Sequence, residues 1–211
     1  MKKVYYAVLA VVCLLAGAIG FQQLTAKVMP EHALYYQQPR MLSPFTLTDH
    51  QGNSFTNQTL AGQWTWVFFG YTSCPDVCPT TLQKLTFIYD DLQKIASNQV
   101  LMVSVDPKRD SQEKLANYIA YFHPDFIALR AGHEVLFPFS RNLGLMYAIT
   151  DGDDANIPEH YLVNHSASMV LINPQGHIVA IFKPEQGVGQ VPSIDGEKLL
   201  TDFARIVQLA S

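Results

Sequence analysis

Charged residues are scarce in this sequence, and no run of basic residues occurs in it. Asp, Glu, Lys and Arg make up 15% of the 211 residues, whereas hydrophobic residues make up 48%. Disordered chains combine low hydrophobicity with high charge, so this composition excludes disorder as a general description. The formal net charge is -4, and the basic surface typical of nucleic-acid binders is missing. We therefore expect a globular protein that does not bind nucleic acid.

Cysteine is also rare, and the chain shows no internal repeat and no low-complexity segment. The three cysteines are Cys13, Cys74 and Cys78. A scaffold held together by disulfides needs a denser and even set, so that class is excluded. Any cysteine chemistry in this chain is therefore local.

The N-terminus carries the one long apolar run. Lys2 and Lys3 precede an uncharged stretch at residues 4–21. Eighteen helical residues span roughly 27 Å, close to the ~30 Å hydrocarbon core of a bilayer. The length favours a retained transmembrane anchor, although the small residues at 16–18 would also serve as a signal-peptide cleavage site. Because N-terminal lysines stay on the cytoplasmic side, we expect the domain on the periplasmic or extracytoplasmic side of the membrane.

The sequence predicts three parts. Residues 1–26 form the anchor or signal segment. Residues 27–44 contain three prolines and little apolar periodicity, which is typical of a tether. Residues 45–211 form one domain.

The domain alternates strand and helix patterns, which is an α/β signature. The tetrapeptide at 173–176 combines Pro and Gly in a turn, so the two strands around it should form an antiparallel hairpin. This order predicts a thioredoxin-like fold with an added N-terminal β-hairpin and one insertion. Strands are expected at 45–48, 65–71, 100–105, 126–129, 146–149, 168–172 and 177–182, and helices at 79–97, 110–121, 133–143 and 194–209.

The most informative segment is the loop that contains Cys74 and Cys78, between a buried strand and a helix. The N-terminus of a helix favours the thiolate, which is both the nucleophile and the metal-binding form of cysteine. Thiols at i and i+4 can form a redox-active disulfide or hold one metal ion between them. A permanent structural disulfide is the alternative, but so short a loop would add little stability.

A site with two cysteines needs further ligands, and seven histidines are available. His165 stands out because it ends a polar loop at 150–164 and directly precedes a strand. In a thioredoxin-like order that position faces the cysteine loop. Two thiolates and one imidazole suit Cu(I) and can hold Cu(II), whereas zinc would need a fourth ligand.

Four motifs in this order resemble the Sco/SenC copper proteins over about residues 40–210. They are Gly70-Tyr71-Thr72-x-Cys74-Pro75-Asp76-x-Cys78-Pro79, Val103-Ser104-Val105-Asp106-Pro107-x-Arg109-Asp110, Tyr118…Phe122-x-Pro124-x-Phe126, and His165-Ser166-Ala167 followed by Leu171-Ile172-Asn173-Pro174-x-Gly176. The resemblance implies a membrane-tethered domain that binds one copper ion and helps to assemble the dinuclear copper centre of a respiratory cytochrome c oxidase. It further implies a copper donor and a thioredoxin-like reductant as additional partners.

The resemblance also assigns residues. Cys74 and Cys78 would be the sulfur ligands of copper, and His165 the nitrogen ligand. Asp106 would support copper loading or partner contact, with a turn or helix-capping aspartate as the alternative. Asn164 stands where many members of the family have Asp, which affects the surroundings of the imidazole rather than its ligation.

The main competitor of a copper chaperone is an exported thiol-disulfide oxidoreductase, whose usual motif has two residues between the cysteines rather than three. We therefore expect a metallochaperone rather than an enzyme. Met102, Met146 and Met169 lie in strand patterns, which favours core packing over thioether ligation.

Overall fold

The computed structural model describes residues 4–6, 11–17, 27–150, 161–185, 187 and 191–210. Within these ranges no helix is long and apolar enough to cross a bilayer. The other residues of the predicted anchor at 4–21 lie outside the described ranges, as does most of the polar loop at 150–164.

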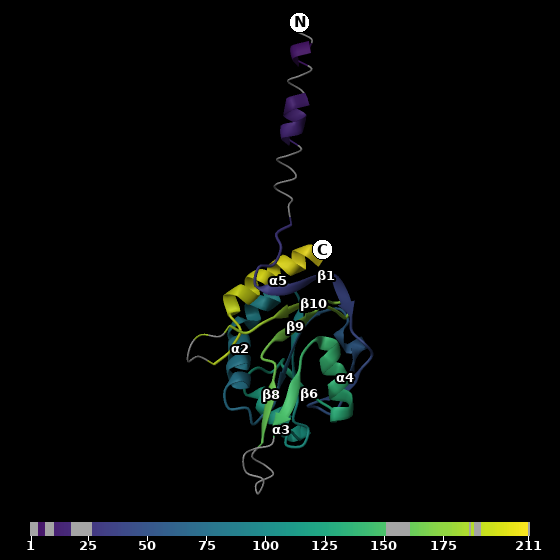
Figure 1. Cartoon of the computed structure of the whole chain (residues 1–211), viewed down its shortest axis with the longest axis vertical. Helices are drawn as coiled ribbons and strands as arrows, with labels where there is room; N and C mark the ends of the chain where they lie inside the picture. Colours follow the sequence, from purple (N-terminus) through teal and green to yellow (C-terminus); the bar gives the residue numbers. More distant parts are fainter. Residues whose placement is uncertain are drawn as a thin grey trace.

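The described chain is built around an eight-stranded sheet with the order β1-β10-β9-β4-β5-β6-β2-β3 (Figure 1). Strands β4, β5 and β6 are parallel to one another, and the remaining pairs of this sheet are antiparallel. A separate antiparallel pair is formed by β7 and β8. The strands are β1 Ala33–Met41, β2 Thr46–Asp49, β3 Ser54–Thr56, β4 Trp64–Gly70, β5 Asn98–Ser104, β6 Ile127–Arg130, β7 Tyr147–Thr150, β8 Leu162–His165, β9 Met169–Ile172 and β10 His177–Phe182.

Helices cover both faces of the sheet, which is why β4 and β5 are buried along their whole length. On one face, Trp66 of β4 packs against Phe203 at a ring distance of 5.1 Å. Helices α2, α3 and α5 contribute to this core, whereas α4 and the β7–β8 pair contribute to the core on the other face. The helical elements are η1 Asn57–Leu60, α2 Val77–Ile95, α3 Gln112–Ala120, α4 His133–Leu143 and α5 Gly196–Ala210.

This architecture confirms the predicted thioredoxin-like order and the hairpin around residues 173–176. Gly176 has a φ of 79°, and its N–H donates to the Asn173 carbonyl at 2.8 Å. The added N-terminal hairpin is β2–β3, which joins the sheet through β6.

The segment at 27–44 differs from the predicted tether, because its residues 33–41 form edge strand β1. This strand pairs antiparallel with β10, from Ala33 opposite Phe182 to Met41 opposite His177. Pro39 lies where the register shifts between Tyr35 and Arg40. An edge strand with such an irregularity tolerates proline because fewer ladder hydrogen bonds are required of it.

Asp202 of α5 fixes the start of this edge strand. Its fully buried carboxylate accepts hydrogen bonds from the backbone N–H groups of Glu31, His32 and Ala33 at 2.9, 2.6 and 2.7 Å. The chain therefore joins the folded domain before residue 45.

Three helices begin two residues away from the predicted start: α2 and α3, described next, and α5, which begins at Gly196 rather than at residue 194. Helix α2 begins at Val77, so Cys78 lies in its first turn together with Pro79, whose missing N–H would have no intrahelical partner there. Helix α3 begins at Gln112, and its N-cap is Ser111, whose side chain accepts from the Lys114 N–H.

The methionine prediction holds for two of the three residues. Met102 and Met169 are fully buried, but Met146 is 78% exposed. Residue 146 precedes Tyr147, which is buried and pairs with His165. Because side chains alternate along a strand, the inward position of Tyr147 directs Met146 outward.

Candidate metal centre

The structure brings together the three side chains predicted as ligands. Cys74 lies in the loop after β4, Cys78 in the first turn of α2, and His165 at the end of β8. The His165 Nε2 lies 3.3 Å from the Cys78 Sγ and 3.9 Å from the Cys74 Sγ. All three ligand atoms lie within 4.8 Å of one another. Among the described residues, these three side chains form a cluster that could hold a metal ion.

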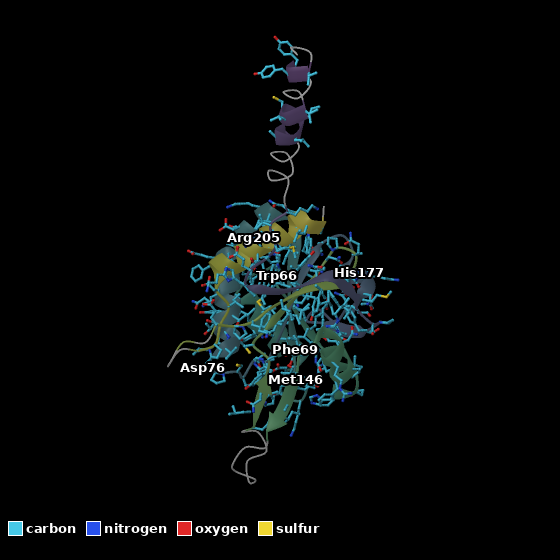
Figure 2. The ribbon with its side chains drawn as sticks, turned by 45° about the horizontal axis from the view of Figure 1, so that its top comes forward. Trp66, Phe69, Asp76, Met146, His177 and Arg205 are labelled. Atoms are coloured by element: carbon cyan, nitrogen blue, oxygen red, sulfur yellow. The ribbon has the colours of Figure 1, made fainter. Side chains whose placement is uncertain are left out.

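The site lies at one end of the domain. Asp76, the N-cap of α2, and Met146, which precedes β7, are both in the half opposite Arg205 of α5 (Figure 2). Cys78 is fully buried and Cys74 is half-buried, so a ligand would reach the pair from the side of Cys74.

The two cysteines are free thiols with very different acidities. The Cys78 thiol donates a hydrogen bond to the Cys74 sulfur, and this holds the pKa of Cys74 at about 4 against the opposing effect of burial. The same hydrogen bond, together with burial, raises the pKa of Cys78 well above the ordinary thiol value. At neutral pH the pair therefore carries one thiolate and one shared proton, and the thiolate is the form that binds metals and attacks disulfides.

His165 presents one ring nitrogen to the sulfurs. Its Nδ1 lies 3.2 Å from the Ser166 carbonyl oxygen, which can only accept a hydrogen bond. The proton therefore belongs on Nδ1, and the lone pair of Nε2 faces the sulfurs. A hydrogen bond from the other ring nitrogen to a carbonyl is the usual arrangement of a metal-binding histidine.

Gly70 makes room for Cys78 at the end of β4. A Cβ at this position would lie 3.1 Å from the Cys78 Sγ and 3.3 Å from the Met102 side chain. Both neighbours are fully buried and cannot move into solvent. The absence of a side chain at residue 70 therefore sets where the inner sulfur lies.

Asp110 holds the cysteine loop against the end of β5. Its fully buried carboxylate accepts hydrogen bonds from the Thr72 N–H at 3.1 Å, the Thr72 hydroxyl at 2.6 Å and the Ser104 hydroxyl at 2.6 Å. The sequence indicated Asp110 only as the start of a helix. Its position just after a parallel strand adjacent to β4 is the signal that could have found this role, because such strand ends share one edge of the sheet.

Asp106 does not belong to the cluster of ligand atoms. Its buried carboxylate accepts hydrogen bonds from the Arg109 Nε and from the Tyr161 hydroxyl. The Arg109 Nη1 in turn donates to the Tyr161 carbonyl at 2.9 Å. Burial and the Asp106 carboxylate together raise the pKa of Tyr161 to about 12, so its hydroxyl stays a donor.

The two interpretations of Asp106 drawn from the sequence concern different contacts of the same carboxylate. The interpretation as a turn or helix-capping aspartate agrees with the hydrogen bond that the Arg109 N–H donates to the carboxylate at 3.4 Å. The contact with Tyr161 fixes the chain directly before β8, the strand that carries His165. A supporting role of Asp106 in copper loading stays a prediction.

Other histidines of the described chain have different surroundings. His50 accepts a hydrogen bond from the Ala128 N–H, His123 packs on Tyr89 at a ring distance of 4.5 Å, and His133 contacts the Tyr147 hydroxyl. None of them belongs to the cluster of possible ligands in the described residues.

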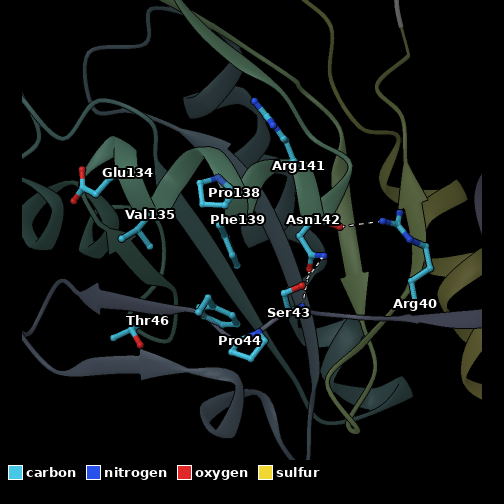
Figure 3. Close-up of a pocket in the computed structure, with 11 residues that line it drawn as sticks. Arg40, Ser43, Pro44, Thr46, Glu134, Val135, Pro138, Phe139, Arg141 and Asn142 are labelled. Carbon is cyan, nitrogen blue, oxygen red and sulfur yellow. Dashed lines mark hydrogen bonds between the residues drawn. The ribbon is translucent and has the colours of Figure 1, made fainter.

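A cavity of about 800 Å³ lies elsewhere, between α4 and the chain that joins β1 to β2 (Figure 3). Its lining includes Phe45, Phe139 and Arg40, whose guanidinium donates to the Asn142 carbonyl at 3.1 Å. No predicted ligand lines this cavity. The chemistry of the cysteines and the histidine is therefore separate from it.

Comparisons with known proteins agree with this geometry. Residues 34–194 match the family described as SCO1/SenC. The human mitochondrial SCO1 homolog is 32% identical over 168 residues, which is 78% of this chain and 55% of the human protein. The chain thus spans about half the length of that relative.

Two solved structures have the same fold and are described as holding copper. Arabidopsis thaliana ScoI with copper bound is 29% identical, with a TM-score of 0.66 over 80% of this chain and 99% of that chain. Yeast Sco1 with copper bound is 27% identical, with a TM-score of 0.69 over 81% of this chain and 90% of that chain.

Proposed function

Because the chain belongs to the SCO1/SenC family, we propose that it is a copper chaperone that binds one copper ion through Cys74, Cys78 and His165. The observation that carries the proposal is the cluster itself, with two sulfurs and an imidazole nitrogen within 4.8 Å of one another. Soft thiolates select Cu(I), and the nitrogen ligand extends the site to Cu(II). The copper bound by the Arabidopsis and yeast proteins supports the same cargo.

The arrangement of the residues suggests how copper is taken up and released. Copper meets the Cys74 thiolate first, because Cys74 is more exposed than Cys78. The proton shared by the two cysteines leaves as the Cys78 sulfur binds the metal, and the Nε2 of His165 completes a trigonal site. Release follows by stepwise ligand exchange with a partner that approaches from the side of Cys74.

The resemblance of the motifs supports a particular acceptor and compartment. We infer that copper passes to the dinuclear copper centre of a cytochrome c oxidase subunit, and that a separate protein donates the copper. The apolar segment at 4–21 would keep the domain at the membrane, on its periplasmic or extracytoplasmic side.

Copper binding requires both cysteines in the reduced form. When the Cys74 thiolate and the Cys78 thiol join in a disulfide they lose two electrons and one proton, and the sulfurs can no longer hold the metal as thiolates. A thioredoxin-like dithiol would restore them by thiol-disulfide exchange and become oxidised itself. The redox state of the pair thus decides whether the chaperone can be loaded.

One observation favours a second function, that of a thiol-disulfide oxidoreductase. The half-exposed Cys74, with its pKa of about 4, has the character of an attacking thiolate, and the buried Cys78 that of a resolving thiol. The His165 imidazole, however, lies against both sulfurs, where a substrate peptide would have to approach. Metal binding therefore remains the better description.

An anaerobic copper titration of the full reduced chain in detergent tests the proposal. We expect one tightly bound copper per chain, lost in the double variant Cys74→Ser, Cys78→Ser. Cys13→Ser is the matched control, because that cysteine lies outside the cluster and its substitution should change nothing. No tight copper, with rapid exchange of disulfides instead, would identify an oxidoreductase.

A further inference from the structure

His165 lies on a segment that the main sheet does not hold. In the described residues, strand β8 pairs with β7 and with no strand of the eight-stranded sheet. The Nδ1 of His165 contacts the carbonyl oxygen of the next residue, Ser166, which belongs to the same segment. The orientation of the imidazole toward the cysteine loop therefore depends on contacts between side chains.

Tyr71, which directly follows β4, contacts all three proposed ligands. Its carbonyl accepts a hydrogen bond from the Cys74 N–H at 3.1 Å, and its own N–H donates to the Cys78 sulfur. Its ring packs edge to face with the His165 imidazole, at a ring distance of 5.8 Å and an angle of 89° between the ring planes. Any residue could make the two backbone contacts, whereas the ring contact requires an aromatic side chain.

The ring of Tyr71 is itself fixed in place. The residue is fully buried, and the guanidinium carbon of Arg109 lies 5.5 Å from the centre of the ring. Arg109 is held in turn by the carboxylate of Asp106. The Tyr71 hydroxyl accepts a hydrogen bond from the backbone N–H of Val163, two residues before His165 on β8. This one side chain therefore joins the end of β4 to the strand that carries the imidazole.

A ring packed in this way restricts the rotation of the imidazole about its Cβ–Cγ bond. Rotation about that bond is otherwise broad, so an unrestrained imidazole would turn its Nε2 away from the sulfurs for part of the time. A ligand that is already ordered raises the affinity, because its ordering is not paid for on binding. The effect should fall mainly on Cu(II), since the two thiolates by themselves hold Cu(I).

We propose that the ring of Tyr71 orients the imidazole of His165 before copper arrives, and that Tyr71 is thereby a positioning residue of the copper site. The inference deepens the proposed function and rests on it. It explains why the residue between a buried strand and the cysteine loop contributes a side chain to the site as well as its backbone.

Two variants separate the ring from the hydroxyl. Tyr71→Leu removes both and keeps the backbone contacts, whereas Tyr71→Phe keeps the ring. In competition titrations of the full chain in detergent, Tyr71→Leu should weaken Cu(II) binding about tenfold, the order of one well-packed aromatic contact, and Cu(I) binding by less. Tyr71→Phe should keep most of the Cu(II) affinity. The EPR spectrum of bound Cu(II) should broaden in Tyr71→Leu, because the imidazole then binds in several orientations.

A measurement without copper tests the same contact. NMR relaxation of ¹³C-labelled histidine reports how freely each imidazole moves, and the variant His165→Ala identifies the signal of His165. The imidazole should be rigid in the parent chain and in Tyr71→Phe, and mobile in Tyr71→Leu. A mobile imidazole in the parent chain would overturn the inference, even if Tyr71→Leu does not fold.

Phe139→Leu is the matched control, because it removes from the same hydrophobic core a ring that packs on Phe45 and Phe69. It should lower the free energy of unfolding, as Tyr71→Leu does, but leave the imidazole rigid and the ratio of the two copper affinities unchanged. An equal change of this ratio in both leucine variants would overturn the inference, as would no change in Tyr71→Leu.

Two further outcomes separate the inference from the proposed function. Equal losses of Cu(II) affinity in Tyr71→Phe and Tyr71→Leu would overturn the role of the ring, because the hydroxyl would then be responsible. Absence of copper binding by the parent chain would overturn the proposed function, while the mobility of the imidazole in the metal-free variants would still decide whether Tyr71 orients His165.

Discussion

The contacts of Asp106 allow a test of how the protein positions His165. The side chain of Asp106 is 2% exposed and that of its partner Arg109 is 16% exposed. The variant Asp106→Asn keeps the shape of the side chain but removes the charge opposite the guanidinium. Breaking a buried pair by removing one partner costs about 3–5 kcal/mol. Because Arg109 keeps some access to water, we expect a loss near the lower end, about 3 kcal/mol.

The same substitution weakens the hydrogen bond from the Tyr161 hydroxyl, which holds the chain before β8. A hydrogen bond to a charged group contributes about 1.5–3 kcal/mol, so Tyr161→Phe should cost this smaller amount and leave the ion pair in place. In both variants the strand that carries His165 loses a restraint, whereas the cysteine loop keeps its own contacts. Binding of Cu(II), which depends more on the imidazole, should therefore weaken more than binding of Cu(I).

Urea denaturation of the metal-free chain measures the stability, and competition titrations measure the two copper affinities. Asp91→Asn is the control, because its ion pair with Lys94 has side chains that are 54% and 73% exposed, and an ion pair this exposed to water contributes little to stability. If Asp106→Asn is no less stable than Asp91→Asn, the buried pair does not hold the structure as argued. An equal loss of Cu(I) and Cu(II) affinity would show that Asp106 does not act through His165.

Three more predictions concern the cluster itself. The variant His165→Ala should keep Cu(I) on the two thiolates and lose most Cu(II) binding, and an unchanged Cu(II) affinity would remove His165 from the site. Gly70→Ala places a Cβ 3.1 Å from the Cys78 sulfur, so a loss of about 1–3 kcal/mol in unfolding free energy and weaker Cu(I) binding are expected; values equal to those of the parent would contradict the packing argument. With a pKa of about 4, Cys74 should be alkylated by iodoacetamide at a constant rate from neutral pH down to about pH 5 and at half that rate near pH 4. A midpoint near the ordinary thiol value of about 8.5 would refute the hydrogen bond from Cys78.

The lowered pKa of Cys74 also determines how the free energy of unfolding changes with pH. Its pKa in the folded protein lies below that of the unfolded chain, so between the two values the unfolded state binds more protons. The stabilisation is fully present above the unfolded value and is lost as the pH falls toward about 4. Thermal unfolding at several pH values below 8 checks this sign, and Cys74→Ser should flatten the dependence.

Local patterns in the sequence were sufficient to predict most of the fold. Short runs of β-branched and aromatic residues predicted β4 and β5, and the turn at 173–176 predicted the hairpin of β9 and β10. These features depend on neighbours within a few residues, which the sequence displays directly. Edge strand β1 escaped prediction because its proline and weak periodicity resemble a tether, and its strand character comes from pairing with β10 about 140 residues later.

The metal centre, like the fold, could be predicted from the sequence only in part. The pair of cysteines is visible in the sequence, because two residues four positions apart at the start of a helix lie close together in any fold of this kind. The choice of His165 among seven histidines came from strand order and family resemblance, and only the folded chain brings it to the sulfurs across 91 residues. The surroundings of those atoms were decided by tertiary structure alone: the space at Gly70 and the buried Asp110. Burial and hydrogen-bond partners are properties of contacts between distant segments, so a sequence pattern can nominate a ligand but cannot by itself show what surrounds it.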